Sequence, residues 1–348
     1  MPPSKRFLLA ANPPARACSS DIRFLVDKSF ELRYSDGPGM FHYSKLACTL
    51  ADAIRLQDVE TQDAKGQAWM QFGNVLRIYG QLPGSRNAFG TAEAHLSLGS
   101  LKPGLQARLW EFRGSLYRDW RKFDQAEKCL ADSAGFYVQA VDITGSHRCL
   151  VSRALCTGKG GDPERAVRLA ESAVRRIDPV TQPHLAVAAV HALCWYLVDA
   201  GDPELALVSC TEADFLFDVL PDELIQAHRS WLRAHIDYAL QHHAAAESLY
   251  RRAARAFAKH EISYELALVL LDLCLPLAAQ HRLAELAAVA TEIIPEFERI
   301  GIGREATASR LLLSAARQAS RAERLKDLAR VSRLVQSALP PARQLPKF

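Results

Sequence analysis

The sequence predicts an all-α protein built as an α-solenoid, a superhelical stack of antiparallel helix pairs. Two observations support this fold class. The tetrapeptide Gly161-Asp162-Pro163-Glu164 recurs forty residues later as Gly201-Asp202-Pro203-Glu204. Small residues recur at about the same interval over much of the chain. Self-similarity with a period of roughly 20–50 residues is the sequence signature of repeat architectures.

Small residues form three series, and the members of each series are separated by 40 or 41 positions. Two antiparallel helices that pack at about 8–10 Å need small side chains where their backbones approach. The series therefore predict where the two helices of each pair, and of neighbouring pairs, nest against one another. The first series is Gly73, Gly114, Ala154, Cys194 and Ala234; the second is Ser85, Ala126, Ala166, Ala206 and Ala246; the third is Ala92, Ser133, Ala173, Ala213 and Ala253.

Helices are predicted in order along the chain, and no segment has a convincing strand pattern. Asp162 and Asp202 are suited to be helix N-caps, because each precedes a proline at the first helical position. The glycine-rich stretch 158–161 is predicted to be a turn between two paired helices. The predicted helices are 20–34 and 40–57, followed by the pairs 64–80/85–98, 104–120/124–141, 147–158/163–177, 184–200/203–219, 223–240/244–260, 263–280/283–299 and 303–320/322–338.

The register of bulky and small residues resembles the tetratricopeptide repeat (TPR). The first unit matches that pattern at Trp69, Gly73, Leu76, Ser85, Phe89 and Ala92, and the second at Trp110, Gly114, Tyr117, Ala126, Leu130 and Ser133. The chain departs from the family in its unit of about 40 residues instead of 34. Trp195 and Trp231 are also displaced from the expected bulky position. The resemblance covers roughly residues 64–266 and identifies the chain as a divergent, TPR-like α-solenoid.

These boundaries predict an N-terminal tail over residues 1–19, a solenoid over 20–338 and a C-terminal tail over 339–348. The expected repeats lie near 64–105, 106–146, 147–186, 187–226, 227–266, 267–300 and 301–338. The last predicted helices are basic: the segment 304–348 has ten Lys/Arg and three Asp/Glu. A solvated face on a terminal repeat accounts for this charge, and contact with nucleic acid is the alternative.

Composition limits the classes of protein that this chain can belong to. Apolar residues make up 49% of the chain and charged residues 24%, which is ordinary for a folded protein, and the net charge of +4 does not indicate a polyanionic partner. The eight cysteines show no CxxC pair and no ligand spacing, so a reducing, cytoplasmic location is expected. Neither a signal peptide nor a membrane span is expected.

Catalytic motifs are not found, and the chain is expected not to be an enzyme. The sequence has no HExxH, GxSxG, GxGxxG or Walker A motif. The histidine pairs His184/His191 and His228/His235 are each seven residues apart, whereas zinc ligands on one helix are usually three or four apart. We therefore expect polar surface at these histidines, with no metal and no cofactor. Carboxylates such as Asp63 are expected on solvated faces.

A TPR-like fold implies that the first helix of each pair lines a groove for a peptide or protein. The register places ten candidate partner-binding residues there: Asn74, Arg77, Arg108, Arg118, Arg148, His191, Trp195, Trp231, His235 and Tyr238. Met70 and Val151 fall on the same face. Arginines in a groove suit an acidic segment, because a guanidinium binds a carboxylate through two hydrogen bonds. The Trp and His residues suit apolar anchors, although the two tryptophans could equally fill the core.

The sequence thus predicts a non-catalytic interaction module, a scaffold, adaptor or regulatory sensor that binds a peptide or protein. Some family members clamp a C-terminal carboxylate with Lys, Asn and Arg, but Met70 stands here at the position of an expected basic residue. Nucleic-acid association through the basic C-terminal helices is the second reading. An unrecognised enzyme is the third.

Overall fold

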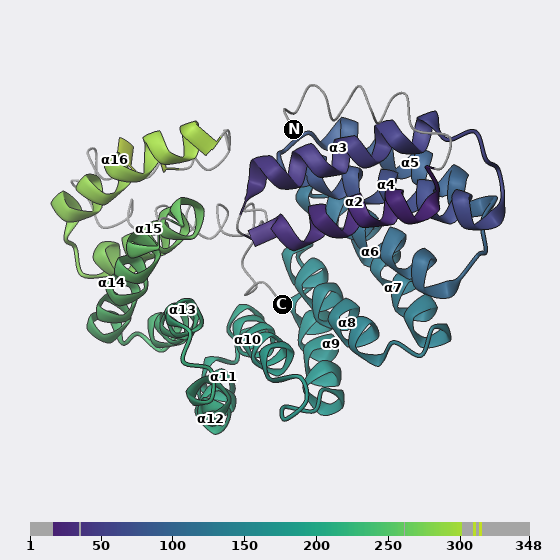
Figure 1. The fold of residues 1–348 in the computed structure, drawn as a ribbon. Helices are drawn as coiled ribbons and strands as arrows, with labels where there is room; N and C mark the ends of the chain where they lie inside the picture. The colour runs from purple at the N-terminus through teal and green to yellow at the C-terminus, as the bar shows by residue number, and fades with distance from the viewer. Residues whose placement is uncertain (1–16, 35, 261, 301–308, 311–312, 315–348) are drawn as a thin grey trace. The chain divides into compact units, whose positions relative to one another are not determined.

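The computed structural model describes residues 17–34, 36–260, 262–300, 309–310 and 313–314, and within them it contains helices and no strand (Figure 1). The predicted all-α class is therefore confirmed. Residues 1–16 of the predicted N-terminal tail, most of the predicted pair 303–320/322–338 and the predicted C-terminal tail lie outside these ranges. The nucleic-acid hypothesis thus stays a prediction.

The chain divides into two compact units, Met1–Cys149 and Leu150–Phe348. From residue 17 on, the first unit consists of a helical hairpin followed by two helix pairs. A 3-10 turn, η1, spans Leu32–Tyr34. The α-helices are α2 (Ser19–Glu31), α3 (Gly37–Ala53), α4 (Val59–Ile78), α5 (Leu82–Ser97), α6 (Pro103–Asp119) and α7 (Phe123–Gln139), and α8 (Ile143–Lys159) crosses the division.

The second unit continues the alternation of first and second helices. Its helices are α9 (Pro163–Arg176), α10 (Pro183–Ala200), α11 (Pro203–Glu212), α12 (Asp214–Asp218), α13 (Glu223–Ala239), α14 (His243–Lys259), α15 (Ser263–Ala279) and α16 (Leu283–Ile300). Most predicted helices agree with these bounds within a few residues. The predicted helix 203–219 was wrong in one respect, because the chain breaks at Ala213. The Thr211 hydroxyl donates to the Leu207 carbonyl at 2.8 Å, a bond that bends helices.

All fifteen residues of the three small-residue series are buried, as predicted. Two glycines show why the series exists. A Cβ added to Gly73 would lie 2.6 Å from the Phe89 ring, and one added to Gly114 would lie 2.7 Å from Leu130 Cγ. Phe89 and Leu130 occupy equivalent positions one repeat apart. The glycine of each first helix therefore makes room for the bulky residue of the second helix.

The turns inside the helix pairs share a backbone conformation as well as a spacing. The last turn residue has a positive φ at Gly80, Gly161 and Gly201, and also at Arg121, Gln241 and His281, where φ is 60°, 65° and 57°. Asp162 caps α9 as predicted, since its side chain accepts from the Arg165 amide at 3.0 Å. Asp202 takes the N-cap position of α11, but its side chain makes no capping hydrogen bond.

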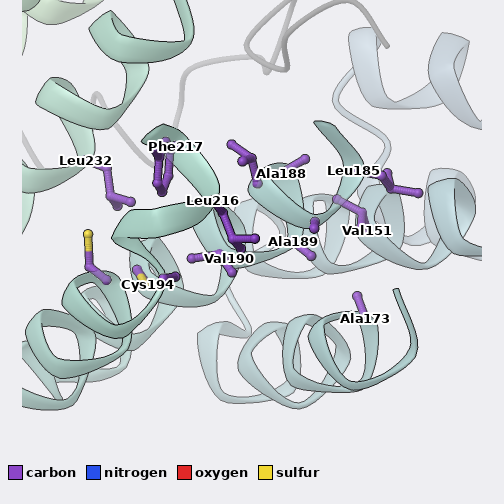
Figure 2. Packing of buried hydrophobic residues seen from close by; sticks show 14 of the residues in the cluster. Val151, Ala173, Leu185, Ala188, Ala189, Val190, Cys194, Leu216, Phe217 and Leu232 are labelled. Carbon is purple, nitrogen blue, oxygen red and sulfur yellow. The ribbon is translucent and has the colours of Figure 1, made fainter. Parts of the chain in front are cut away.

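One hydrophobic core of the second unit forms where α10 meets its neighbours (Figure 2). Cys194 and Ala189 of α10 are fully buried, and Phe217 of α12 and Leu232 of α13 complete the same cluster. Of the described helices, α10 alone has the length and apolar composition to cross a membrane, and 56% of that stretch is buried within the fold. Its apolar surface is used here as protein core.

The first helices of successive pairs lie against one another: α4 contacts α6, α10 contacts α13, and α13 contacts α15. They therefore form a continuous layer within each unit. Three residues expected to be exposed are buried instead. Met70 and Val151 pack into the core, at 2% and 1% exposed. Asp63 is also buried, and both of its carboxylate oxygens accept hydrogen bonds from Ser100. The Ser100 amide donates at 2.9 Å and the Ser100 hydroxyl at 2.5 Å.

Candidate functional site

Two neighbouring first helices of the second unit bring three histidines and two tryptophans together. Helical spacing explains the arrangement: residues four apart on α10, and residues three and seven apart on α13, lie on one face. Four of the ten predicted partner-binding residues belong to this group. The members are His191 and Trp195 on α10, and His228, Trp231 and His235 on α13.

Trp195 is the centre of this cluster. Its ring stacks on His235 with 4.2 Å between centroids and 10° between planes, and on His191 with 5.7 Å and 18°. Trp231 meets it edge-on at 5.8 Å and 89°. Trp195 and His191 are part-exposed, so they form the accessible side of the cluster. We call His191, Trp195 and His235 the His–Trp face.

Trp231 was predicted to anchor a partner, but it belongs to the core. Only 3% of the residue is exposed, and its ring packs edge-on against Phe257 at 6.0 Å. Its indole Nε1 donates to Asp272 Oδ2 at 2.7 Å, so the polar edge is satisfied inside the protein. The alternative reading, in which a tryptophan fills the core, is correct for Trp231. Trp195 remains accessible.

His235 and His191 have buried ring nitrogens that lack a hydrogen-bond partner among the described residues. Both ring nitrogens of His235, a residue that is 7% exposed, are buried without a partner, and so is Nε2 of His191. The Asp199 carboxylate lies 3.6 Å from His235 Nε2, beyond hydrogen-bond distance. A buried polar group without a partner costs about 1–3 kcal/mol. Such groups are rare in folded proteins and need an explanation.

Burial keeps the imidazoles of His191 and His228 neutral at pH 7. It lowers the pKa of His191 to about 3, with smaller contributions from His228, His235 and Lys159. Burial also lowers the pKa of His228 to about 4, against a small opposing effect of Asp222. Because His228 and His235 are only 8% and 7% exposed, their prediction as polar surface was wrong. At neutral pH His191 and His228 are thus uncharged, and the cluster has unused hydrogen-bonding capacity.

The predicted arginines of the first unit lie on the first helices but are engaged within the protein. Arg77 donates to Asp119 at 2.5 Å and to Asn74 Oδ1 at 3.0 Å and 3.2 Å. The guanidinium of Arg118 lies 3.6 Å from the same Asp119. Arg108 lies 5.9 Å from the ring centroids of Phe30 and Phe112. Asp119 thus offsets part of the positive charge expected to attract an acidic partner.

Arg148 is hydrogen-bonded to Glu111 and Tyr137. Its guanidinium donates to both carboxylate oxygens of Glu111, at 2.6 Å and 2.9 Å, and the Tyr137 hydroxyl donates to Glu111 at 2.5 Å. The hydrogen bond to Glu111 raises the pKa of Arg148 above its ordinary value. Replacing Arg148 by Glu would place two carboxylates together, so this change would destabilise the unit as well as alter its surface.

Tyr238, the last predicted site residue, lies on α13 but outside the stacked rings. It is part-buried, and its ring is 5.6 Å from that of His243. The described residues contain no group of three or more His, Cys, Asp or Glu side chains that could hold a metal ion. Sequence reasoning missed the roles of His228 and Asp272. Asp272 follows Trp231 by 41 residues, one repeat, which is the signal that could have linked them.

Comparison with known proteins shows the fold through structure and not through sequence. No protein-family model and no curated protein matches the chain. A Rap protein complexed with competence and sporulation factor aligns with a TM-score of 0.68 and 14% identity, over 92% of this chain and 88% of that chain. The Rap conjugation gene regulator of a plasmid, solved with a Phr peptide, has a TM-score of 0.51 and 12% identity, over 96% and 98%.

A third similar structure is described as a tetratricopeptide repeat protein. It is a signal transduction ATPase with numerous domains and a tetratricopeptide repeat sensor from Pyrococcus horikoshii, with a TM-score of 0.55 and 12% identity. The alignment covers 93% of this chain and 53% of that one. Together with the buried small-residue register and the paired helices, these likenesses show that the chain has a divergent TPR-like fold with units of about 40 residues.

Proposed function

We propose that this protein is a non-catalytic regulatory sensor or adaptor that binds a peptide segment of a partner on the His–Trp face. The observation that carries the proposal is Trp195. It is a part-exposed indole between two near-parallel imidazoles, beside buried nitrogens that have no hydrogen-bond partner. An extended peptide can supply both an apolar side chain for the rings and backbone groups for the nitrogens. Aromatic side chains of this kind are frequent energetic centres of interfaces.

Similar structures support a peptide as the class of partner. Two of them contain a bound signalling factor or peptide, namely competence and sporulation factor and a Phr peptide. The arginines of the first unit are less suited to be the primary site. An acidic partner would have to replace Asp119 as the counter-ion of Arg77 or Glu111 as the counter-ion of Arg148, so each new ion pair would cost an existing one.

A non-catalytic, cytoplasmic role is part of this proposal. The strongly perturbed histidines owe their low pKa chiefly to burial and pack as rings, and the ion-paired carboxylates hold neighbouring helices together. All eight cysteines are free thiols, and seven of them are buried, which suits a reducing compartment.

Peptide selection followed by measured binding tests the proposal. Hexapeptides selected from a randomised display library on the full-length protein would be labelled, and their affinities measured by fluorescence anisotropy. Trp195→Ala is expected to weaken binding by at least about tenfold, because it removes a central aromatic anchor. Trp110→Ala is the matched control, since Trp110 is a part-exposed tryptophan on α6 in the other unit. A library that yields no binder, or equal affinities for the two variants, would refute the assignment.

A further inference from the structure

The surroundings of His191 differ from those of the other two imidazoles in the sign of their charges. The groups that act electrostatically on His191 are His228, whose ring is 6.2 Å away, His235 and Lys159 near the end of α8. Each of these can carry positive charge, and none can carry negative charge. His191 also keeps a buried Nε2 without a hydrogen-bond partner among the described residues.

Three carboxylates near the cluster interact with groups other than His191. Asp199 on α10 lies beside His235. Asp222 caps α13 by accepting from the Leu224 amide at 2.8 Å, and it acts on His228. Asp272 on α15 accepts from the Trp231 indole. The His191 end of the cluster is therefore the end where an incoming negative charge meets cationic or neutral groups.

We infer that His191 binds a carboxylate of the peptide, with Trp195 taking the apolar side chain next to it. This inference rests on the proposed function and names the chemical group that the face recognises. The carboxylate comes from an Asp or Glu side chain or from a C-terminus, and the chemistry at His191 is the same for both. The ring of His191 is part-exposed, so the carboxylate approaches it from the accessible side of the cluster.

Charge pairing makes this contact pH-dependent. Free His191 is neutral at pH 7, and a bound carboxylate raises the pKa of its imidazole because it favours the charged form. Affinity therefore rises as the pH falls through the pKa of the bound imidazole. The acidic segment expected from the sequence would therefore bind at His191 on α10 and not at the arginines of the first unit.

Three small probes separate the two sources of the carboxylate. N-acetyl-phenylalanine has a C-terminal carboxylate, N-acetyl-aspartyl-phenylalanine amide has only a side-chain carboxylate, and N-acetyl-phenylalanine amide has none. Each is titrated into full-length protein labelled with carbon-13 at histidine Cε1, and the NMR signal lost in His191→Gln identifies His191. At least one acidic probe is expected to shift this signal and to bind at least about tenfold more tightly than the neutral amide, or about 1.4 kcal/mol.

Variants of His191 separate the hydrogen bond from the charge. His191→Gln keeps a donor and is expected to bind the acidic probe with no rise in affinity between pH 7 and pH 5, whereas His191→Leu loses at least about tenfold. His184→Gln is the matched control on the exposed start of α10 and should retain the wild-type pH dependence. Thermal unfolding of each variant checks that the fold is intact.

Equal affinities for acidic and neutral probes, or a pH dependence that survives in His191→Gln, would overturn the inference. Such results would leave the proposed function standing if the selected hexapeptides still required Trp195. Conversely, a display library without binders, together with acidic probes that shift His191, would remove the peptide proposal and retain the carboxylate site.

Discussion

The indole Nε1 of Trp231 donates a 2.7 Å hydrogen bond to Oδ2 of Asp272, a residue one repeat further along the chain. The bond joins α13 to α15, and both residues are 3% exposed. Because Trp231 also meets Trp195 edge-on, the bond positions the inner wall of the His–Trp face. A buried residue of one repeat, Asp272, thereby helps to position the His–Trp face of the preceding repeats.

Loss of the Asp272 carboxylate should loosen the second unit. Asp272→Ala leaves the Trp231 N–H buried without an acceptor, so we expect the free energy of unfolding to fall by about 1–3 kcal/mol. Asp272→Asn retains an acceptor oxygen and should lose less. Urea titration followed by tryptophan fluorescence measures both. Equal stabilities for Asp272→Ala and the wild type would show that the bond contributes nothing.

A larger side chain at Gly73 should disrupt the packing of α4 on α5. The added Cβ would meet the Phe89 ring at 2.6 Å, so Gly73→Ala is expected to lower the free energy of unfolding by about 1–3 kcal/mol. Gly90→Ala is the control, because Gly90 is exposed on α5 and its added Cβ meets no atom within 4 Å. That change should raise helix stability by about 0.5–1 kcal/mol. Thermal denaturation distinguishes the opposite signs.

Glycine should be preferred at Gln241, where φ is 65° in the turn between α13 and α14. The left-handed conformation costs an L-residue about 1–2 kcal/mol, and glycine avoids the steric part of that cost. Gln241→Gly is therefore expected to stabilise the protein by about 0.5–1 kcal/mol. Gly201→Ala, at the equivalent turn with φ of 97°, should destabilise it. Chemical denaturation that gave the same sign for both changes would contradict this reading of the turns.

Acid should destabilise the second unit well before its carboxylates are titrated. The pKa of His228 is about 4 in the folded protein and 6.5 as its ordinary value, so the unfolded chain binds a proton first. Stability is full above pH 6.5 and falls as the pH decreases toward 4, by up to about 3 kcal/mol for this residue. His191 adds a loss of the same sign.

Unfolding free energies at pH 7.5, 5.5 and 4.5 measure this effect. His228→Gln cannot take up the proton, so it should show a smaller loss of stability over this range than the wild type. His184→Gln, on the exposed start of α10, serves as the control and should follow the wild-type curve. A wild-type stability that did not change between pH 7.5 and 4.5 would disagree with a buried, neutral His228.

Much of the fold could be predicted because packing within a helix pair depends on local spacing. Gly73 and Phe89 are sixteen residues apart, and the turn between them leaves few ways to bring two helices together. The break at Ala213 could not be predicted, because the residues 203–219 have a helical pattern throughout. There α11 ends at Glu212 and α12 begins at Asp214.

The candidate site was predicted in part. His191, Trp195 and His235 do lie together on α10 and α13, as the register indicated. Trp231 was predicted on the same face, but it packs in the core, where Asp272 accepts the hydrogen bond of its indole. Arg148 likewise turned to Glu111, which lies 37 positions earlier. These contacts join residues of different repeats, and spacing within one repeat carries no information about them.

By itself, the sequence determined the class, the period and the buried series of small residues, because two helix backbones can approach closely only where side chains are small. Tertiary structure alone decided which aromatic and charged side chains of the first helices remain available. That choice depends on whether a partner such as Asp272 or Asp119 stands within hydrogen-bond distance on the next repeat. A buried polar group must find such a partner or lose the energy of its contact with water.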